Sequence, residues 1–92
     1  MGKSSRECPR RLAEKLLQIR VGLGLSQNEM LTALGLKDRV FRSAVSGYEL
    51  GTREPSLLVL LKYSQLAGVH LEVLVDDSID LPAHLPAQLA SD

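Results

Sequence analysis

The chain has 92 residues, of which 45% are hydrophobic, 24% charged and only 3% aromatic. A chain of this length buries about 60–65% of its unfolded surface, which is enough for one domain but too little for a catalytic cleft between two. The composition argues against wholesale disorder. Because Trp is absent, the core must be built mainly from Leu, Val and Ala, which favours helices.

The zero net charge hides an asymmetry along the chain. Residues 1–62 contain all 11 Lys and Arg and six acids, a net charge of +5, whereas residues 63–92 contain five acids and no base, a net charge of −5. Such a distribution suits a basic surface that meets a polyanion, with an acidic end held away from it.

Several classes of protein are excluded or disfavoured. No apolar run approaches the roughly 18–20 residues that span a bilayer, and the N-terminal stretch MGKSSRECP cannot act as a signal peptide, so we expect a cytoplasmic protein without a membrane partner. Cys8 is the only cysteine and excludes an internal disulfide. His70 and His84 have no further ligand at metal spacing. With no Gly-rich phosphate loop and no nucleophile beside a base, we expect no metal, no cofactor and no enzymatic activity.

The first periodic segment predicts an amphipathic helix over about residues 9–21. Pro9 suits the first helical position, and either Gly22 or Gly24 supplies the left-handed stop. Its inner face carries Leu12, Leu16 and Ile19.

A second helix is predicted to start at Gln27, since Ser26 and Glu29 have the spacing of a capping box. Gly35 ends this helix, which is so short that tertiary packing must hold it. Its predicted inner side is Met30, Leu31 and Leu34.

The stretch FRSAVSGYEL predicts a third helix over about residues 41–50, ended by Gly51. The sequence leaves two alternatives for the first residue of this helix. Either Asp38 is the N-cap of a helix that begins early, or residues 37–40 form a loop. One face is apolar and turned inward, made of Phe41, Ala44, Val45 and Tyr48. The opposite face is built from short or basic residues, namely Arg42, Ser43, Ser46 and Gly47.

Two further helices complete the predicted domain. Pro55-Ser56 opens the most apolar helix, closed by Gly68, and we expect its leucines to form core: Leu57, Leu58, Leu60, Leu61 and Leu66. VHLEVLVDD predicts a short fifth helix with His70 near its cap. The following segment contains two prolines and is expected to be flexible or extended. We therefore divide the chain into an arm (1–8), a domain (9–76) and an acidic tail (77–92).

Two short helices joined near a glycine, the second with a polar outer stripe, form a helix-turn-helix arrangement. Residues 16–75 also resemble the Cro/phage-repressor type (XRE-like) family, through LLQIRVGLGLSQNEM and AVSGYELGTREPSLLVLLKYSQLAGVHLEVL. The resemblance covers about two-thirds of the chain. It implies an all-α, lambda-repressor-like bundle of about five short helices. It also implies a sequence-specific DNA-binding transcriptional regulator of prokaryotic or phage type, acting as a repressor.

The resemblance assigns roles to individual residues. Gln27 would contact a DNA phosphate at the start of the second helix. Arg42 and Ser43 would read bases in the major groove, where an arginine can bind O6 and N7 of guanine together. Ser46 and Gly47 would let the helix approach the bases closely. The alternative for each is a small or polar residue that merely faces water.

Further residues are predicted to position or support this surface. Lys37, Arg39 and Arg53 would bind phosphates through counterion release, or else lie idle in solvent. The resemblance also implies an internal ion pair between Arg20 and Glu49, which ties the first helix to the end of the third.

The chain departs from the family pattern in two places. Leu31 stands where the family usually has a small residue at the crossing of the second and third helices. The segment from Gly35 to Glu49 is about four residues longer than in common members, which leaves the register of Arg39 against the groove open.

Two partner hypotheses follow. In the first, a homodimer binds double-stranded DNA at a palindrome with half-sites about 34 Å apart, and the fifth helix and tail supply the contact between subunits. In the second, the chain is an antitoxin-like interaction module whose tail binds a basic partner protein, with or without operator binding.

Overall fold

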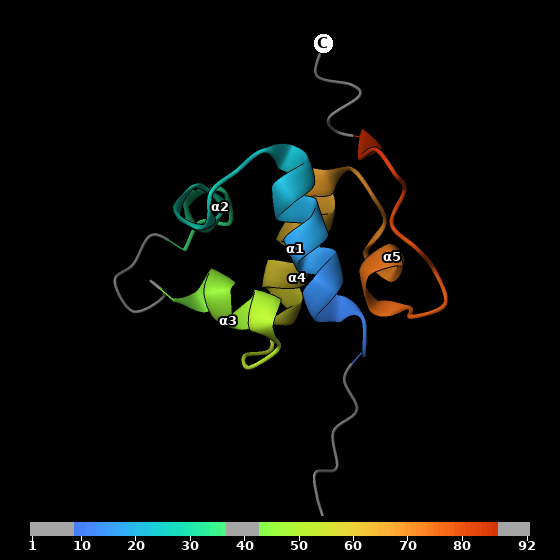
Figure 1. Cartoon of the computed structure of the whole chain (residues 1–92), viewed down its shortest axis with the longest axis horizontal. Helices are drawn as coiled ribbons and strands as arrows, with labels where there is room; N and C mark the ends of the chain where they lie inside the picture. Colours follow the sequence, from blue (N-terminus) through green and yellow to red (C-terminus); the bar gives the residue numbers. More distant parts are fainter. Residues whose placement is uncertain (1–8, 37–42, 87–92) are drawn as a thin grey trace, which may run out of the picture.

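The computed structural model describes residues 9–36 and 43–86 (Figure 1). Those residues form five helices and no strand: α1 (Leu12–Leu23), α2 (Gln27–Ala33), α3 (Ala44–Leu50), α4 (Leu57–Ala67) and α5 (Leu71–Val75). The all-α fold is as predicted. The third helix begins at Ala44 rather than near residue 41. None of the described helices is long and apolar enough to cross a membrane.

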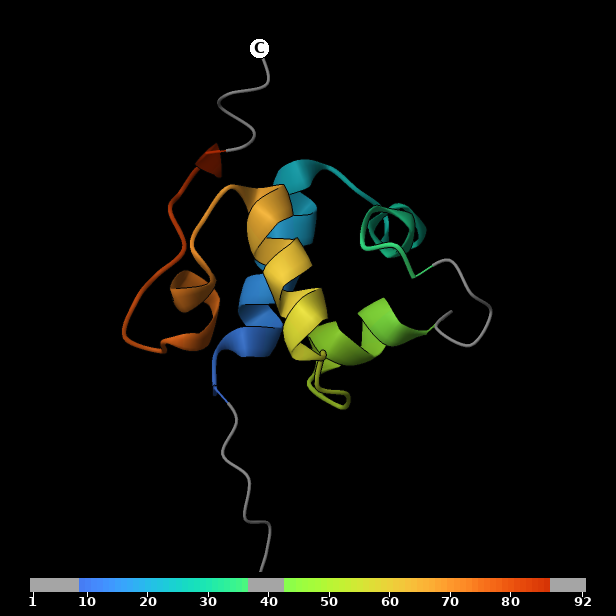
Figure 2. The same cartoon turned by 180° about the vertical axis from the view of Figure 1, so that it is seen from behind.

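The helices α1 and α4 overlap at the centre of the molecule, with α1 in front in Figure 1 and α4 in front in Figure 2, and they are in contact. The pair α2 and α3 lies on one side of them, and α5 on the other. Contacts run from α1 to α3, α4 and α5, so that α1 joins the two sides. This arrangement holds α3 at the edge of the bundle with one of its faces outward.

The predicted ends of the helices have clear local causes. Gly24 closes α1 at φ 73°, a left-handed conformation that glycine adopts without a steric penalty. Ser26 then caps α2: its Oγ accepts from the backbone N–H of Glu29 at 3.1 Å, and the Glu29 carboxylate accepts from the N–H of Ser26 at 2.8 Å. The predicted capping box is confirmed. The left-handed Gly24 and the capping box together define the turn that connects α1 to α2.

The core is a single cluster in which aliphatic residues surround two tyrosines. The rings of Tyr48 and Tyr63 meet edge to face, with centroids 6.5 Å apart. The described residues of the predicted inner sides of α2 and α3 are buried as expected: Met30, Leu31, Leu34, Ala44, Val45 and Tyr48. Phe41, also predicted on the inner side of α3, lies outside the described residues. Leu31 is therefore part of the core at the crossing of α2 and α3.

The prediction that all five leucines of α4 form core is wrong. Leu58 exposes 76% of its surface and Leu57 68%, while Leu60 is buried. The inward stripe of α4 instead consists of Leu60, Tyr63, Ser64 and Ala67, at the i, i+3, i+4, i+7 spacing of one helical face. Apolar residues lie on several sides of the start of α4, but the neighbouring helices cover only one of these sides. The leucines on the other sides therefore stay exposed.

The segment after α5 differs from the expected separate tail. Residues 76–86, here called the strap, run back along α1, and Leu85 is buried in the core. A methyl group added at Gly22 would lie 3.0 Å from Cδ1 of Leu85, so the glycine makes room for this contact. The buried Leu85 thus holds the strap against the bundle. Of the predicted tail, only residues 87–92 lie outside the described residues.

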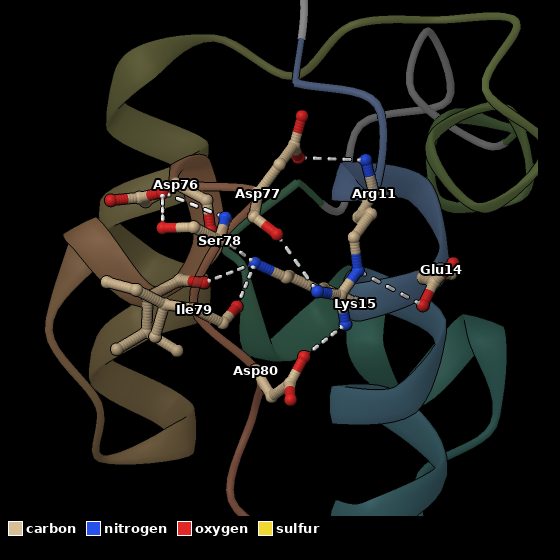
Figure 3. A network of polar contacts seen from close by, with 9 residues as sticks. Arg11, Glu14, Lys15, Asp76, Asp77, Ser78, Ile79 and Asp80 are labelled. Atoms are coloured by element: carbon tan, nitrogen blue, oxygen red, sulfur yellow. Dashed lines mark hydrogen bonds and ion pairs between the residues drawn. The ribbon is translucent and has the colours of Figure 1, made fainter.

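Polar contacts fix the other end of the strap to the start of α1 (Figure 3). The carboxylate of Asp77 accepts from the backbone N–H groups of Arg10 at 2.8 Å and of Arg11 at 3.0 Å. The Arg11 guanidinium donates to the carbonyl of Asp77 and forms an ion pair with Asp80 at 2.8 Å. The hydrogen bonds from Arg10 and Arg11 lower the pKa of Asp77. The strap therefore caps the amino terminus of α1.

Lys15 is the second polar link between α1 and the strap (Figure 3). The residue is fully buried, and its Nζ donates to the carbonyls of Val73 at 2.8 Å, Asp76 at 2.9 Å and Ile79 at 2.7 Å. Two of these carbonyls, those of Val73 and Asp76, lie at the carboxyl end of α5, where a cation is favoured, and the third belongs to the strap. One side chain thus joins α1, α5 and the strap.

Candidate nucleic-acid interface

The outward face of α3 is made of small side chains and one large apolar one. Ser43 is exposed at the N-cap position, where its side chain makes no capping hydrogen bond. Ser46 and Gly47 are partly exposed one turn later, and Leu50 exposes 73% of its surface. The face points outward because Ala44, Val45 and Tyr48 occupy the opposite side of the helix in the core.

Gly47 allows the loop after α3 to fold back on the helix. The backbone N–H groups of Thr52 and Arg53 both donate to the carbonyl of Gly47, at 3.0 and 3.2 Å. A Cβ at position 47 would lie 2.9 Å from Cβ of Arg53, closer than real side chains approach. The space beside Gly47 is therefore occupied by the stem of Arg53, a contact that sequence reasoning did not predict.

Together α3 and this loop enclose an open hollow of about 270 Å³. Its walls are mostly short or polar, and Arg53 contributes a cation. Side chains of these kinds can lie close to a polyanion or to base edges without a steric barrier. The residues that line it are Ser43, Ser46, Gly47, Leu50, Thr52 and Arg53.

Behind this surface an ion pair joins α1 to the last turn of α3. Nε and Nη2 of Arg20 donate to the two carboxylate oxygens of Glu49, at 2.6 and 3.2 Å. Only 18% of the Arg20 side chain and 6% of the Glu49 side chain are exposed. The hydrogen bond that Arg20 donates to Glu49 raises the pKa of Arg20. A shielded two-point contact of this kind fixes the angle between two elements as well as their distance.

Gln27 belongs to the same network. Its Nε2 donates to Oε1 of Glu49 at 3.0 Å, and Nη1 of Arg20 donates to the carbonyl of Leu25 at 3.0 Å. The first turn of α2 is thereby linked to α1 and α3 while Gln27 stays exposed. The carboxylate of Glu49 thus joins α1, α2 and α3 by hydrogen bonds, in addition to their apolar packing.

The structure gathers the predicted site residues into two groups. Ser43, Ser46, Gly47 and Arg53 surround the hollow, whereas Gln27, Arg20 and Glu49 form the network behind it. The remaining three predicted contacts, Lys37, Arg39 and Arg42, lie outside the described residues.

Sequence reasoning missed Leu50 as part of the outward face. A usable signal was present, because position 50 follows Ser46 by four residues and Gly47 by three, which places it on their side of a helix. Position 50 was assigned to neither face of the helix from the sequence. In residues 9–36 and 43–86, no group of three or more His, Cys, Asp or Glu could hold a metal ion.

Comparison with curated proteins and with solved structures finds no match to this chain. Residues 16–74 match a family described as helix-turn-helix, a span that includes α2, α3 and the network that joins them. The matched span covers more than half of the chain and is of the Cro/C1, XRE-like type. The chain therefore belongs to this family of DNA-binding helix-turn-helix regulators.

Proposed function

We propose that this protein is a sequence-specific transcriptional repressor that reads the major groove with α3. The observation that carries the proposal is the hollow on the outward face of α3, lined by short side chains and Arg53. A helix needs such a face to approach base edges, and the rigid link from Glu49 to α1 and α2 supports its alignment on the duplex.

The proposal divides the site residues by the kind of contact. Ser43, Ser46 and Gly47 face base edges together with Arg42, whose guanidinium binds guanine. The others bind phosphates and carry no sequence information directly. They are Gln27, Lys37, Arg39 and Arg53.

Selection of bound sequences from a random pool of duplex DNA tests the proposal as a whole. We expect enrichment of a motif with guanine in each half-site, arranged as a palindrome. A selection at low salt that enriches no motif would contradict base readout by α3.

Single substitutions separate the two kinds of contact. Arg53→Ala should weaken binding to all sequences by a similar factor and reduce the slope of log K against log salt by about 1. Arg42→Ala should instead relax the preference for guanine, at a cost of roughly 1–3 kcal/mol on the preferred sequence. Fluorescence anisotropy over a salt series measures both. Lys62→Ala removes the same charge from the exposed side of α4 and is the control.

The alternative, a module whose acidic tail binds a basic partner protein, gains no support from the described part of the tail. Asp77 and Asp80 are already bound to the start of α1. Absence of duplex binding, together with protection of residues 77–92 by a co-purified protein, would favour that module over the repressor.

We further propose that the repressor binds as a homodimer on its palindrome. A domain of this size has a small contact area on DNA, and two half-sites about 34 Å apart double it. Two protein chains per palindromic duplex in a titration is the expected stoichiometry.

A further inference from the structure

Leu50 lies in the last turn of α3 and exposes 73% of its surface. It follows Tyr48 of the inward face by two residues, which turns its side chain about 200° round the helix axis from that residue. It follows Ser46 by four residues and Gly47 by three, and so lies on their side of the helix. The position of Leu50 in the helix therefore keeps its side chain out of the core.

Exposure alone gives Leu50 no function, since single exposed leucines are common on protein surfaces. What distinguishes it is that it lines the hollow between α3 and the following loop. The hydroxyl groups of the hollow come from Ser43, Ser46 and Thr52, and its cation from Arg53. Among the described residues that line the hollow, Leu50 is the one with a large hydrocarbon side chain.

A hydrocarbon side chain can recognise few features of a base pair. Hydrogen-bond donors and acceptors on a base edge need polar partners, and an alkyl group placed against them leaves them unsatisfied. The apolar group in the major-groove pattern of the four base pairs is the C5-methyl group of thymine. A leucine on the outward face of a helix that reads the major groove is therefore matched to thymine.

We propose that Leu50 contacts the C5-methyl group of a thymine in each half-site and is a specificity-determining residue for that base. The inference rests on the proposed function, since it requires α3 to lie in the major groove. Arg53 supports this placement, because it lines the same hollow and a phosphate bound to it would hold the last turn of α3 close to the duplex.

Replacement of thymine by uracil in the selected duplex tests the contact directly. Uracil keeps the base pair and lacks only the C5-methyl group. We expect the replacement of one particular thymine in a half-site to weaken binding of wild type about fourfold, the effect of exposing one buried methyl group to water. Fluorescence anisotropy measures the affinity for each duplex.

Two substitutions assign this effect to Leu50. Leu50→Ala should bind the thymine duplex about fourfold or more weakly than wild type and should bind the thymine and uracil duplexes equally, because two groups in contact do not act additively. Leu50→Gln keeps a side chain of similar size with a polar end, and it should lose the discrimination as well. Thermal unfolding checks that both variants are folded.

The matched control is Leu58→Ala, at a position on α4 that is 76% exposed and does not line the hollow. This variant should discriminate between thymine and uracil like wild type. A purely structural role of Leu50 would weaken binding to both duplexes alike and leave their affinity ratio unchanged. Wild-type discrimination in both Leu50 variants would therefore overturn the proposal.

The same measurements separate this inference from the proposed function. If wild type enriches a motif but binds thymine and uracil equally at every position, the role of Leu50 is wrong and base readout by α3 stands. A selected motif without thymine in either half-site has the same meaning. Failure of wild type to bind any duplex would instead overturn the proposed function, and this inference with it.

Discussion

The ammonium group of Lys15 donates to three backbone carbonyls, of which the carbonyl of Asp76 also accepts from the N–H of Ile79. Lys15→Met keeps an unbranched apolar stem of similar size but removes the donor from these part-buried carbonyls. We expect the free energy of unfolding to fall by about 3 kcal/mol, since hydrogen bonds to a charged group contribute about 1.5–3 kcal/mol. Urea denaturation measures the change.

The matched control for Lys15 is Lys62→Met, at an exposed position on α4. Surface substitutions of this kind change stability by about 0.5 kcal/mol or less. A Lys15→Met variant as stable as Lys62→Met would show that the strap does not depend on this side chain.

The burial of Lys15 was within reach of the sequence, but its partners were not. Position 15 falls three residues after Leu12 and four before Ile19, on the inward face of α1. Lysine is almost never fully buried unless it is paired, so the residue type predicts an exposed side chain where the helical spacing predicts a buried one. The partners are backbone carbonyls about sixty residues later, which carry no side-chain pattern to detect. The capping box of α2, by contrast, is local and was predicted fully.

Tyr63 provides a test of an unpaired hydroxyl. In the described part of the chain its buried OH has no hydrogen-bond partner, and burial raises its pKa. Tyr63→Phe keeps the edge-to-face contact with Tyr48 and removes only the hydroxyl. We expect stability to be unchanged or to rise by about 1 kcal/mol.

Tyr63→Leu removes the ring as well and separates the two contributions. It should lower stability by about 1 kcal/mol or more, because an aromatic pair contributes beyond its buried area. Thermal unfolding of both variants measures the difference. A loss of stability in Tyr63→Phe as large as that in Tyr63→Leu would mean that the hydroxyl is satisfied in solution.

At the scale of whole elements, periodicity predicted the inward faces of α2 and α3 and failed for α4. In α3, polar residues separate the apolar positions, so that only one stripe can be turned inward. In α4 the run LLVLL places apolar residues on several sides at once, and no pattern distinguishes the stripe toward α1 from the side that carries the exposed Leu57, Leu58 and Leu61. The choice depends on which neighbours are present to cover each side.

Gly47→Ala tests the packing of the loop on α3. Alanine raises helix propensity by about 1 kcal/mol in an open position, but here its Cβ would meet Cβ of Arg53. We expect the loop to be displaced, with lower affinity for duplex DNA and no gain in thermal stability. Ser46→Ala, one residue earlier on α3, is the control for the effect of helix propensity on thermal stability only, because Ser46 itself lines the hollow. A Gly47→Ala protein that is both more stable and fully active would contradict this packing.

Across the whole molecule, the family and the order of the helices were predictable, whereas the strap was not. Two prolines and the acids of residues 76–80 are also typical of a solvated tail. The difference lies in Leu85, which finds space beside Gly22, and in Asp77, which finds the start of α1. Both contacts join residues more than sixty positions apart, and neither spacing nor composition reveals such pairs.

The strap should also determine how the molecule responds to acid. In the folded chain the pKa of Asp77 is lowered, first by the hydrogen bond from Arg10 and then by that from Arg11. The unfolded chain, with an aspartate pKa of about 3.9, therefore binds its proton at a higher pH than the folded chain does. The stability that the Asp77 carboxylate contributes is complete above that value and is lost as the pH falls through the lower folded pKa.

Asp77→Asn removes this contribution at every pH. Wild type should be more stable than the variant at neutral pH, and the difference should shrink as the pH falls below about 4. Urea denaturation at a series of pH values measures it, with Glu72→Gln as the control for the loss of one negative charge from the exposed side of α5. Stability curves of wild type and Asp77→Asn that stay parallel in acid would show that the capping of α1 by the strap does not depend on the charge of Asp77.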